Sequence, residues 1–254
     1  MPTMDSILTR VQSNPITHLS CRSLNALEGY IIGYYQACDV WSVPQPVEEI
    51  DRDDLFRWLC SQIETTSEHA GRLNAFNWLN IIPWAHFLSA DDREAFDTYF
   101  ELRAQAPRTA KPTVLVRETS ANPVPRETLL DTLQRIRERP AMYFGNRFQP
   151  LQLWSFSCGF YWAEQDNEIK SSLSEPLFTS FPIWLATRYP FSQGVPWHRL
   201  FDALGLSSPL WAFDCFIEHL GLFLSGKPSD TPDSTMQCIL ENILRRDDFD
   251  GETE

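Results

Sequence analysis

The sequence has 254 residues, of which 34 are acidic and 21 basic, and its formal net charge at pH 7 is −13. Such a charge repels nucleic-acid phosphates and anionic membrane surfaces, so we expect neither as a partner; it favours a basic partner, although solubility alone would also explain it. Hydrophobic residues make up 43% of the chain and aromatic residues 13%, which excludes an intrinsically disordered protein.

The first 14 residues contain Asp5 and Arg10 and no long apolar run, so no secretory signal is predicted. No apolar stretch approaches the roughly 20 residues of a transmembrane helix. The cysteines are scattered without a C-x-x-C pair, which predicts reduced, mostly buried thiols. They are Cys21, Cys38, Cys60, Cys158, Cys215 and Cys238. Together these features predict a cytoplasmic protein.

In chain order, the first predicted element is a short helix that must end near Asn14, because Pro15 follows. Its apolar face consists of Met4, Ile7, Leu8 and Val11. A second helix begins at Ser23, a plausible N-cap, and its apolar residues recur at three- and four-residue steps. These are Leu24, Leu27, Ile31 and Tyr34. Gly29 and Gly33 lie one turn apart and predict close approach of a neighbouring helix, at some cost in helix propensity.

A third helix is predicted to start at Asp53 or Asp54 and to carry Trp58 on its apolar face. A later helix is predicted to have Ser89 as its N-cap, with Asp91 and Asp92 in the first turn, where acidic residues favour the helix dipole. The segment 104–125 contains four prolines and should not be helical, because proline removes a donor and restricts its predecessor. We interpret it as a linker.

After the linker, the same series of patterns begins again. A helix carrying Leu129, Leu130, Leu133 and Ile136 should end at Arg139, because Pro140 follows. Another is predicted from Ser208, with an apolar face of Phe213, Phe216, Ile217, Leu220 and Phe223. A last helix is predicted over 234–245, and the acidic tail after it should be frayed.

The two series can be aligned. Residues 7–15 match 132–140, and residues 23–37 match 149–163 when one residue is inserted. Trp58-Leu59 and Ala95-Phe96-Asp97 then match Trp184-Leu185 and Ala212-Phe213-Asp214, in the same order. We therefore predict a mainly α fold with few or no strands, built from two tandem, homologous modules. The predicted parts are a diverged first module (1–105), a Pro-rich linker (106–125), a second module (126–228), and a C-terminal helix with its tail (229–254).

Signatures of catalysis and metal binding are missing from the sequence. The five histidines form neither an H-x-x-x-H nor an H-E-x-x-H pair, and no Gly-rich phosphate loop is present. Cys158 stands among Phe and Trp in a helical pattern, where a cysteine is usually a small core residue. The many adjacent carboxylates do not show the two different environments that would shift their pKa values apart, as a general acid and a general base require. We predict a non-enzymatic protein without cofactor or metal.

The second module carries the most specific pattern. Residues 139–145 read R-P-A-M-Y-F-G, and they are followed by G-F-Y-W-A (159–163), F-P-I-W-L (181–185) and G-V-P-W (194–197). This order resembles a group of small bacterial proteins with an R-P-x-M-Y-[LF]-G turn, a G-[YF]-x-x-A helix, an F-P-x-[WF]-[VL] segment and a later Trp. Members of that group look like immunity proteins encoded beside polymorphic toxins. In the first module the turn reads N-P-I-T-H-L-S (14–20), so its Arg, Met, Tyr and Gly are lost.

The resemblance implies a protein that binds and neutralises a cognate, cytosol-acting toxin by occluding its active site or substrate surface. The alternatives are an adaptor or scaffold that inhibits nothing, and an enzyme with an unrecognised helical site. If the R-P-A-M-Y-F-G turn is structural, Met142 and Tyr143 should be core residues; a binding role is the other possibility. The predicted partner-binding residues are acidic: Glu48, Glu49, Asp51, Asp53, Asp54, Asp91, Asp92, Glu94, Glu164, Asp166 and Glu168.

Overall fold

The computed structural model describes residues 2–47, 89–106, 128–144, 148–170, 174–205 and 208–226, together with 58, 85, 108, 238, 240 and 241. This part of the chain is mainly helical and has no strand, as predicted, apart from an isolated bridge between Thr3 and Val47. The predicted helix after Asp53, most of the linker, Gly145 and most of 234–245 lie outside the described residues.

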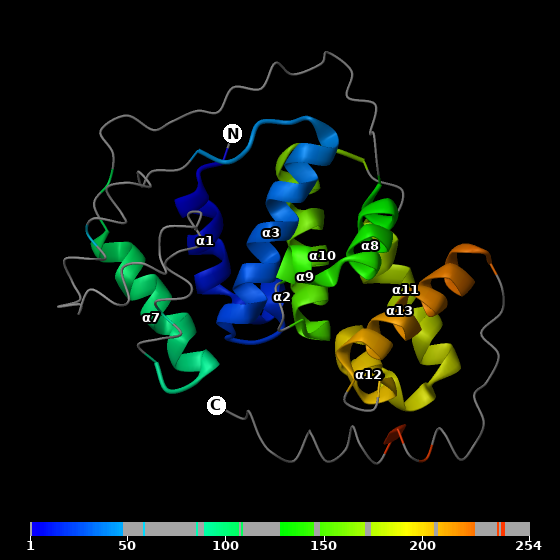
Figure 1. Ribbon diagram of the computed structural model, residues 1–254. Coiled ribbons are helices and arrows are strands. Elements are labelled where there is room, and N and C mark those ends of the chain that lie inside the picture. Colours follow the sequence, from blue (N-terminus) through cyan, green and yellow to red (C-terminus); the bar gives the residue numbers. More distant parts are fainter. Residues whose placement is uncertain are drawn as a thin grey trace.

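The helices fall into two groups along the chain (Figure 1). The first group consists of α1 (Met4–Ser13), α2 (Pro15–Leu19), α3 (Leu24–Trp41) and α7 (Asp92–Gln105). The second consists of α8 (Leu129–Glu138), α9 (Pro140–Phe144), α10 (Pro150–Asp166), α11 (Ser174–Arg188), the 3-10 turn η3 (Pro190–Ser192), α12 (Trp197–Leu204) and α13 (Pro209–Leu224).

Capping residues and prolines set the helix boundaries much as the sequence predicts. Ser23 caps α3, since its Oγ accepts a hydrogen bond from Ala26 N at 3.0 Å. The predicted apolar faces of α1 and α3 are fully buried. The prediction for α7 was wrong in detail: its N-cap is Asp91 rather than Ser89, whose hydroxyl instead donates to Thr98 Oγ1 at 3.0 Å. The last turn of α7 also includes Ala104 and Gln105, so the prediction that the whole segment 104–125 is non-helical was wrong for these two residues.

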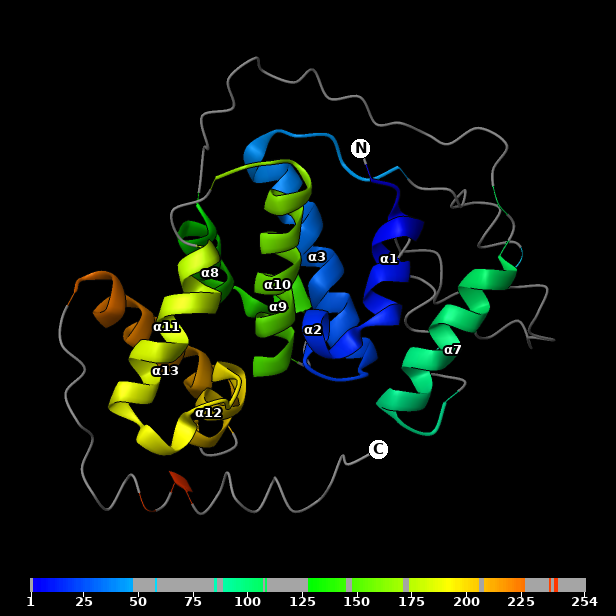
Figure 2. The same cartoon turned by 180° about the vertical axis from the view of Figure 1, so that it is seen from behind.

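The centre of the fold is the pair α3 and α10, which lie side by side where the two groups meet in both views (Figures 1 and 2). The helices touch through glycines, as the spacing of Gly29 and Gly33 predicts. A Cβ at Gly33 would overlap the backbone oxygen of Phe156, and a Cβ at Gly159 would overlap the backbone oxygen of Tyr30. Only glycine permits this approach, because any side chain at either position would collide with the facing backbone.

The units α1–α2–α3 and α8–α9–α10 are alike in length and order. Their helices have 10, 5 and 18 residues in the first unit and 10, 5 and 17 in the second. The glycine contacts are reciprocal as well: Gly33 with Phe156 and Tyr30 with Gly159 are the same contact after a shift of about 126 positions. This is the packing that two copies of one unit would make, while the duplication itself stays a prediction.

Among the described residues, no single helix is long and apolar enough to cross a membrane. The bent pair α12 and α13, which meet at 119°, satisfies that criterion only when the two are taken together and only by length and composition.

Candidate protein-binding surface

The first predicted acidic group, Glu48 to Asp54, lies outside the described residues. The second group, on α7, forms caps. Asp91 Oδ1 accepts from Glu94 N at 2.8 Å, and Glu94 Oε2 accepts from Ala90 N at 2.6 Å. Asp92 Oδ1 accepts from both the backbone and the side-chain nitrogen of Asn25, at 3.2 and 3.0 Å. These carboxylates therefore hold the start of α7 and its contact with α3, while Asp91 and Glu94 stay exposed.

The third predicted group is divided by the fold. Glu164 is 1% exposed, and its Oε1 accepts from Trp41 Nε1 at 2.9 Å. Asp166 receives two hydrogen bonds of 2.8 Å from the Arg10 guanidinium and one of 2.8 Å from the Tyr34 hydroxyl. Both residues thus join α10 to the first group of helices. Glu168, by contrast, is exposed.

The charge of Asp166 is stabilised by these contacts. Burial alone would raise the pKa of its carboxyl, but the hydrogen bonds from Arg10 and Tyr34 and the positive charge of Arg10 outweigh it and lower that pKa. The guanidinium also lies over the Trp162 ring, 4.8 Å from its centroid. Asp166 is therefore occupied within the fold and is not presented to a partner.

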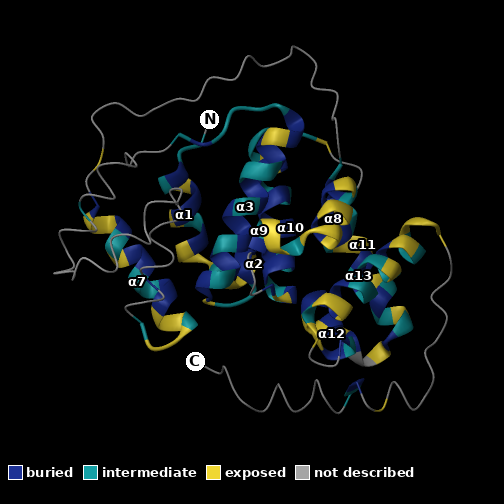
Figure 3. Cartoon of the chain, in the orientation of Figure 1, coloured by how far each residue is buried: buried dark blue, intermediate teal, exposed yellow. Residues whose placement is uncertain are grey.

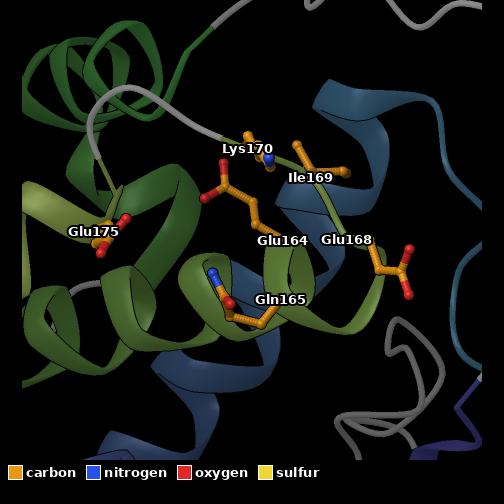
Figure 4. Close-up of a pocket in the computed structure, with 6 residues that line it drawn as sticks. All are labelled: Glu164, Gln165, Glu168, Ile169, Lys170 and Glu175. Atoms are coloured by element: carbon orange, nitrogen blue, oxygen red, sulfur yellow. The ribbon is translucent and has the colours of Figure 1, made fainter.

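A pocket of about 430 Å³ lies where α10 ends and α11 begins (Figure 4). Its lining consists of Glu164, Gln165, Glu168, Ile169, Lys170 and Glu175. Two of these, Glu164 and Glu168, belong to the predicted acidic group. Figure 4 shows Glu175 coming from the α11 side, while the Glu168 carboxylate points away from the other carboxylates. The pocket thus brings carboxylates near one another without converging them on a single point.

The five cysteines that the structure describes are all free, but only Cys38 and Cys158 are buried, so the prediction of mostly buried thiols was wrong. Cys21 and Cys215 are half-buried and Cys238 is exposed. Burial raises the pKa of the Cys158 thiol, so the thiol stays protonated, as expected for a core cysteine. Burial also lowers the pKa of His198 to about 3 and that of His18 to about 4, the latter with help from the charge of Arg10. Both imidazoles are therefore neutral near pH 7. In the described part of the chain, no group of three His, Cys, Asp or Glu residues could hold a metal ion.

Large apolar side chains are exposed at six described positions, and five of them follow the linker. They are Ile16 at 62% exposure, Met142 at 71%, Ile183 at 69%, Leu210 at 56%, Trp211 at 52% and Leu224 at 44%. The prediction of Met142 as a core residue was therefore wrong. Tyr143 is half-buried against the core, with its ring 6.4 Å from that of Phe156. Figure 3 shows where exposed ribbon occurs along α8, α9 and α13.

Three of the exposed residues come from helix ends that are tied together. Phe148 packs against Phe144 of α9 and against Phe213 of α13, with both pairs of ring centroids 5.4 Å apart. Beside this junction, Arg137 Nε of α8 donates to Asp214 Oδ1 of α13 at 2.6 Å. Met142 stands two residues before Phe144, and Leu210 and Trp211 stand three and two residues before Phe213. We call Met142, Leu210 and Trp211 the α9–α13 surface.

The predicted sites did not include this surface. Of the apolar face predicted for α13, Phe213, Phe216 and Leu220 are buried, while Ile217 and Phe223 are half-buried against the core. Trp211 precedes Phe213 by two residues and so points to the other side of the helix. The signal was available in the sequence: a tryptophan off the apolar face of an amphipathic helix has no core to enter.

Comparison with known proteins gives no relative. No family model, no curated protein and no solved structure matches this chain.

Proposed function

We propose that the protein is an immunity protein that binds and neutralises a cognate bacterial toxin, with the α9–α13 surface as its principal contact. The observation that supports this most directly is the exposure of Met142, Leu210 and Trp211 on helices whose other sides are packed. Trp and Met are enriched in protein interfaces, and a few buried aromatic anchors supply most of the binding energy.

The identity of the partner rests on two further features. The order of motifs from the R-P-A-M-Y-F-G turn to Trp197 resembles that of toxin immunity proteins. The net charge of −13 would accelerate association with a partner whose own substrate site is basic, as in a nuclease.

The experiment is co-expression with the product of the adjacent upstream gene, scored for cell survival and for a complex that co-purifies. We expect the gene product to be toxic alone and harmless with this protein. A complex without toxicity would indicate an adaptor instead. If neither toxicity nor a complex is observed, the proposal is wrong.

The surface is tested by Trp211→Ala in the same assay. We expect a roughly 30-fold or greater loss of affinity, as for an interface anchor, without loss of the fold, because the side chain is half exposed. Ile183→Ala is the matched control: Ile183 is also an exposed apolar residue, but it stands on α11, which contributes no residue to the α9–α13 surface. Equal effects of the two substitutions would contradict the assignment of the surface.

A further inference from the structure

The turn between α1 and α2 and the turn between α8 and α9 have the same backbone conformation. Asn14 has φ −144° and ψ 69°, and Arg139 has φ −143° and ψ 58°. Each is followed by a proline that begins a five-residue helix. The molecule therefore contains one turn built twice with different side chains. A residue that differs between the two copies is not dictated by the backbone.

The inward-facing residues of the two turns, His18 and Tyr143, make equivalent packing contacts. His18 of α2 packs edge-on against Tyr30, with ring centroids 5.9 Å apart and planes at 87°. Tyr143 of α9 packs edge-on against Phe156, at 6.4 Å and 90°. The next residue is buried in both copies. Tyr143 and Phe144 of the R-P-A-M-Y-F-G turn are thus explained by packing alone.

The outward-facing residues of the two turns differ in their chemistry. Asn14 Oδ1 accepts from Thr17 N at 3.4 Å and so caps α2. The side chain of Arg139, at the same place before α9, has no acceptor, and only the Arg139 backbone oxygen accepts from Met142 N, at 3.0 Å. The Arg139 side chain is exposed and makes no ion pair with any described residue. Met142, at the place of Thr17, is 71% exposed. Relative to the first turn, the second lacks the side-chain cap and has an exposed cation three residues before an exposed thioether.

We propose that Arg139 and Met142 are the specificity contact of the α9–α13 surface, and that they recognise a carboxylate beside an apolar depression on the toxin. The planar guanidinium carries five donors in a geometry that fits a carboxylate, and the flexible Met side chain adapts to an apolar socket. An unpaired arginine on a chain of charge −13 is not explained by solubility, which the acidic residues already provide.

The assignment rests on the proposed function, because it names the chemistry of the same interface. Arg139 follows Arg137, whose ion pair with Asp214 ties α8 to the helix that carries Leu210 and Trp211. The residues of the R-P-A-M-Y-F-G turn therefore have two roles. Tyr143 and Phe144 pack within the fold, while Arg139 and Met142 contact the partner.

The test replaces the outward-facing residues of the second turn with those of the first. The variant Arg139→Asn with Met142→Thr keeps the backbone conformation already seen at Asn14, and Asn restores a capping acceptor. Affinity for the adjacent upstream gene product is measured by calorimetry, and folding by thermal melting. We expect the affinity to fall by roughly 30-fold or more while the melting temperature does not fall. Arg93→Asn with Ile16→Thr is the matched control, because it removes one exposed arginine and one exposed apolar side chain from the first group of helices.

The outcomes separate the two proposals. If the wild-type protein binds and the exchanged variant binds equally well, the contact is wrongly assigned and the proposed function stands. A variant that loses affinity only together with a lower melting temperature would show that Arg139 and Met142 are structural. If the control loses as much affinity as the exchanged variant, the effect is nonspecific and the assignment fails. Absence of any complex with the wild-type protein overturns both proposals.

Discussion

The units α1–α2–α3 and α8–α9–α10 make the same arrangement with different chemistry at their crossings. Around the first crossing, Arg10 and Tyr34 converge on Asp166 with hydrogen bonds of 2.8 Å, and His18 lies against Tyr30. In the second unit, the positions of Tyr30 and Tyr34 are taken by Phe156 and Phe160, which are fully buried. We call Arg10, His18, Tyr30, Tyr34 and Asp166 of α10 the polar crossing, and Tyr143, Phe156 and Phe160 the apolar crossing. The glycine contacts between α3 and α10 are common to both units.

The shared glycines and buried apolar rings therefore suffice to pack α3 against α10. The polar crossing is also imperfectly satisfied, because His18 Nδ1 is buried without a hydrogen-bond partner among the described residues. Buried polar groups left in this way cost stability, so the polar crossing contributes orientation more than net stability. It fixes α1 and α3 against α10 through one ion pair that joins the two groups of helices.

The largest expected effect comes from breaking the shared feature. Gly33→Leu and Gly159→Leu each place a side chain against the backbone of the facing helix, which cannot yield as a side chain can. We expect each to destabilise the protein by roughly 4 kcal/mol or more, at the extreme end of single substitutions. Urea unfolding followed by circular dichroism would measure the loss.

Gly221→Ala is the control for these substitutions. Gly221 lies inside α13, and a Cβ there would meet nothing within 4 Å. We expect it to stabilise the protein by about 0.5 to 1 kcal/mol, because alanine has the higher helix propensity. If the Gly159 variant were as stable as the Gly221 variant, the close crossing of α3 and α10 would be wrong.

The next effect concerns the polar crossing alone. Asp166→Asn removes the partner of the half-buried Arg10 and should cost about 2 to 3 kcal/mol, whereas Tyr34→Phe, which introduces the residue found at Phe160, should cost only about 1 kcal/mol. Because the pKa of Asp166 is lowered in the folded protein, its contribution is complete above the unfolded pKa of about 3.9 and is lost as pH falls through the folded value. Urea midpoints of the two variants at pH 7 test the order. A larger loss for Tyr34→Phe than for Asp166→Asn would contradict it.

Local features of this fold could be predicted from the sequence. The apolar faces of α1 and α3, the stop before Pro15 and the cap at Ser23 follow from spacing and from the chemistry of single residues. The glycine spacing predicted a close neighbour for α3. It could not identify α10 as that neighbour, because the contact is set by packing between residues more than a hundred positions apart.

The candidate site was harder to predict for the same reason. Glu164 and Asp166 stand at a polar helix end that looks solvated in sequence, yet Trp41 and Arg10 reach them from the other group of helices. Met142 follows the pattern of a core residue, but a five-residue helix that begins with proline buries only its last positions here. Long-range partners and short helices are the two cases in which local periodicity carries little information.

A smaller effect distinguishes the two crossings by pH. Burial and the charge of Arg10 lower the pKa of His18 to about 4, so the unfolded chain, with a pKa near 6.5, binds the proton first. Stability should therefore fall as pH drops from about 6.5 toward 4, by about 2 kcal/mol between pH 7 and pH 5 from this residue. His18→Tyr, which copies Tyr143, should reduce that dependence in urea titrations at the two pH values. An unchanged slope would show that His18 is already accessible to protons in the folded protein.

The smallest effect has the opposite sign and tests whether the second turn sacrifices stability. Arg139→Asn introduces at α9 the cap that Asn14 provides at α2, with φ and ψ within 1° and 11° of those of Asn14. A capping side chain contributes about 0.5 to 2 kcal/mol to a helix, so this substitution should raise the free energy of unfolding by about 0.5 to 1 kcal/mol. Arg93→Asn, on the exposed side of α7 and inside the helix, should not. A higher free energy of unfolding for Arg139→Asn would mean that Arg139 does not serve folding. Residues that bind a partner often reduce the stability of the free protein, so this result would support a binding role. A loss there would place Arg139 among the residues that hold the turn, and the contact with the toxin would have to come from Met142, Leu210 and Trp211 alone.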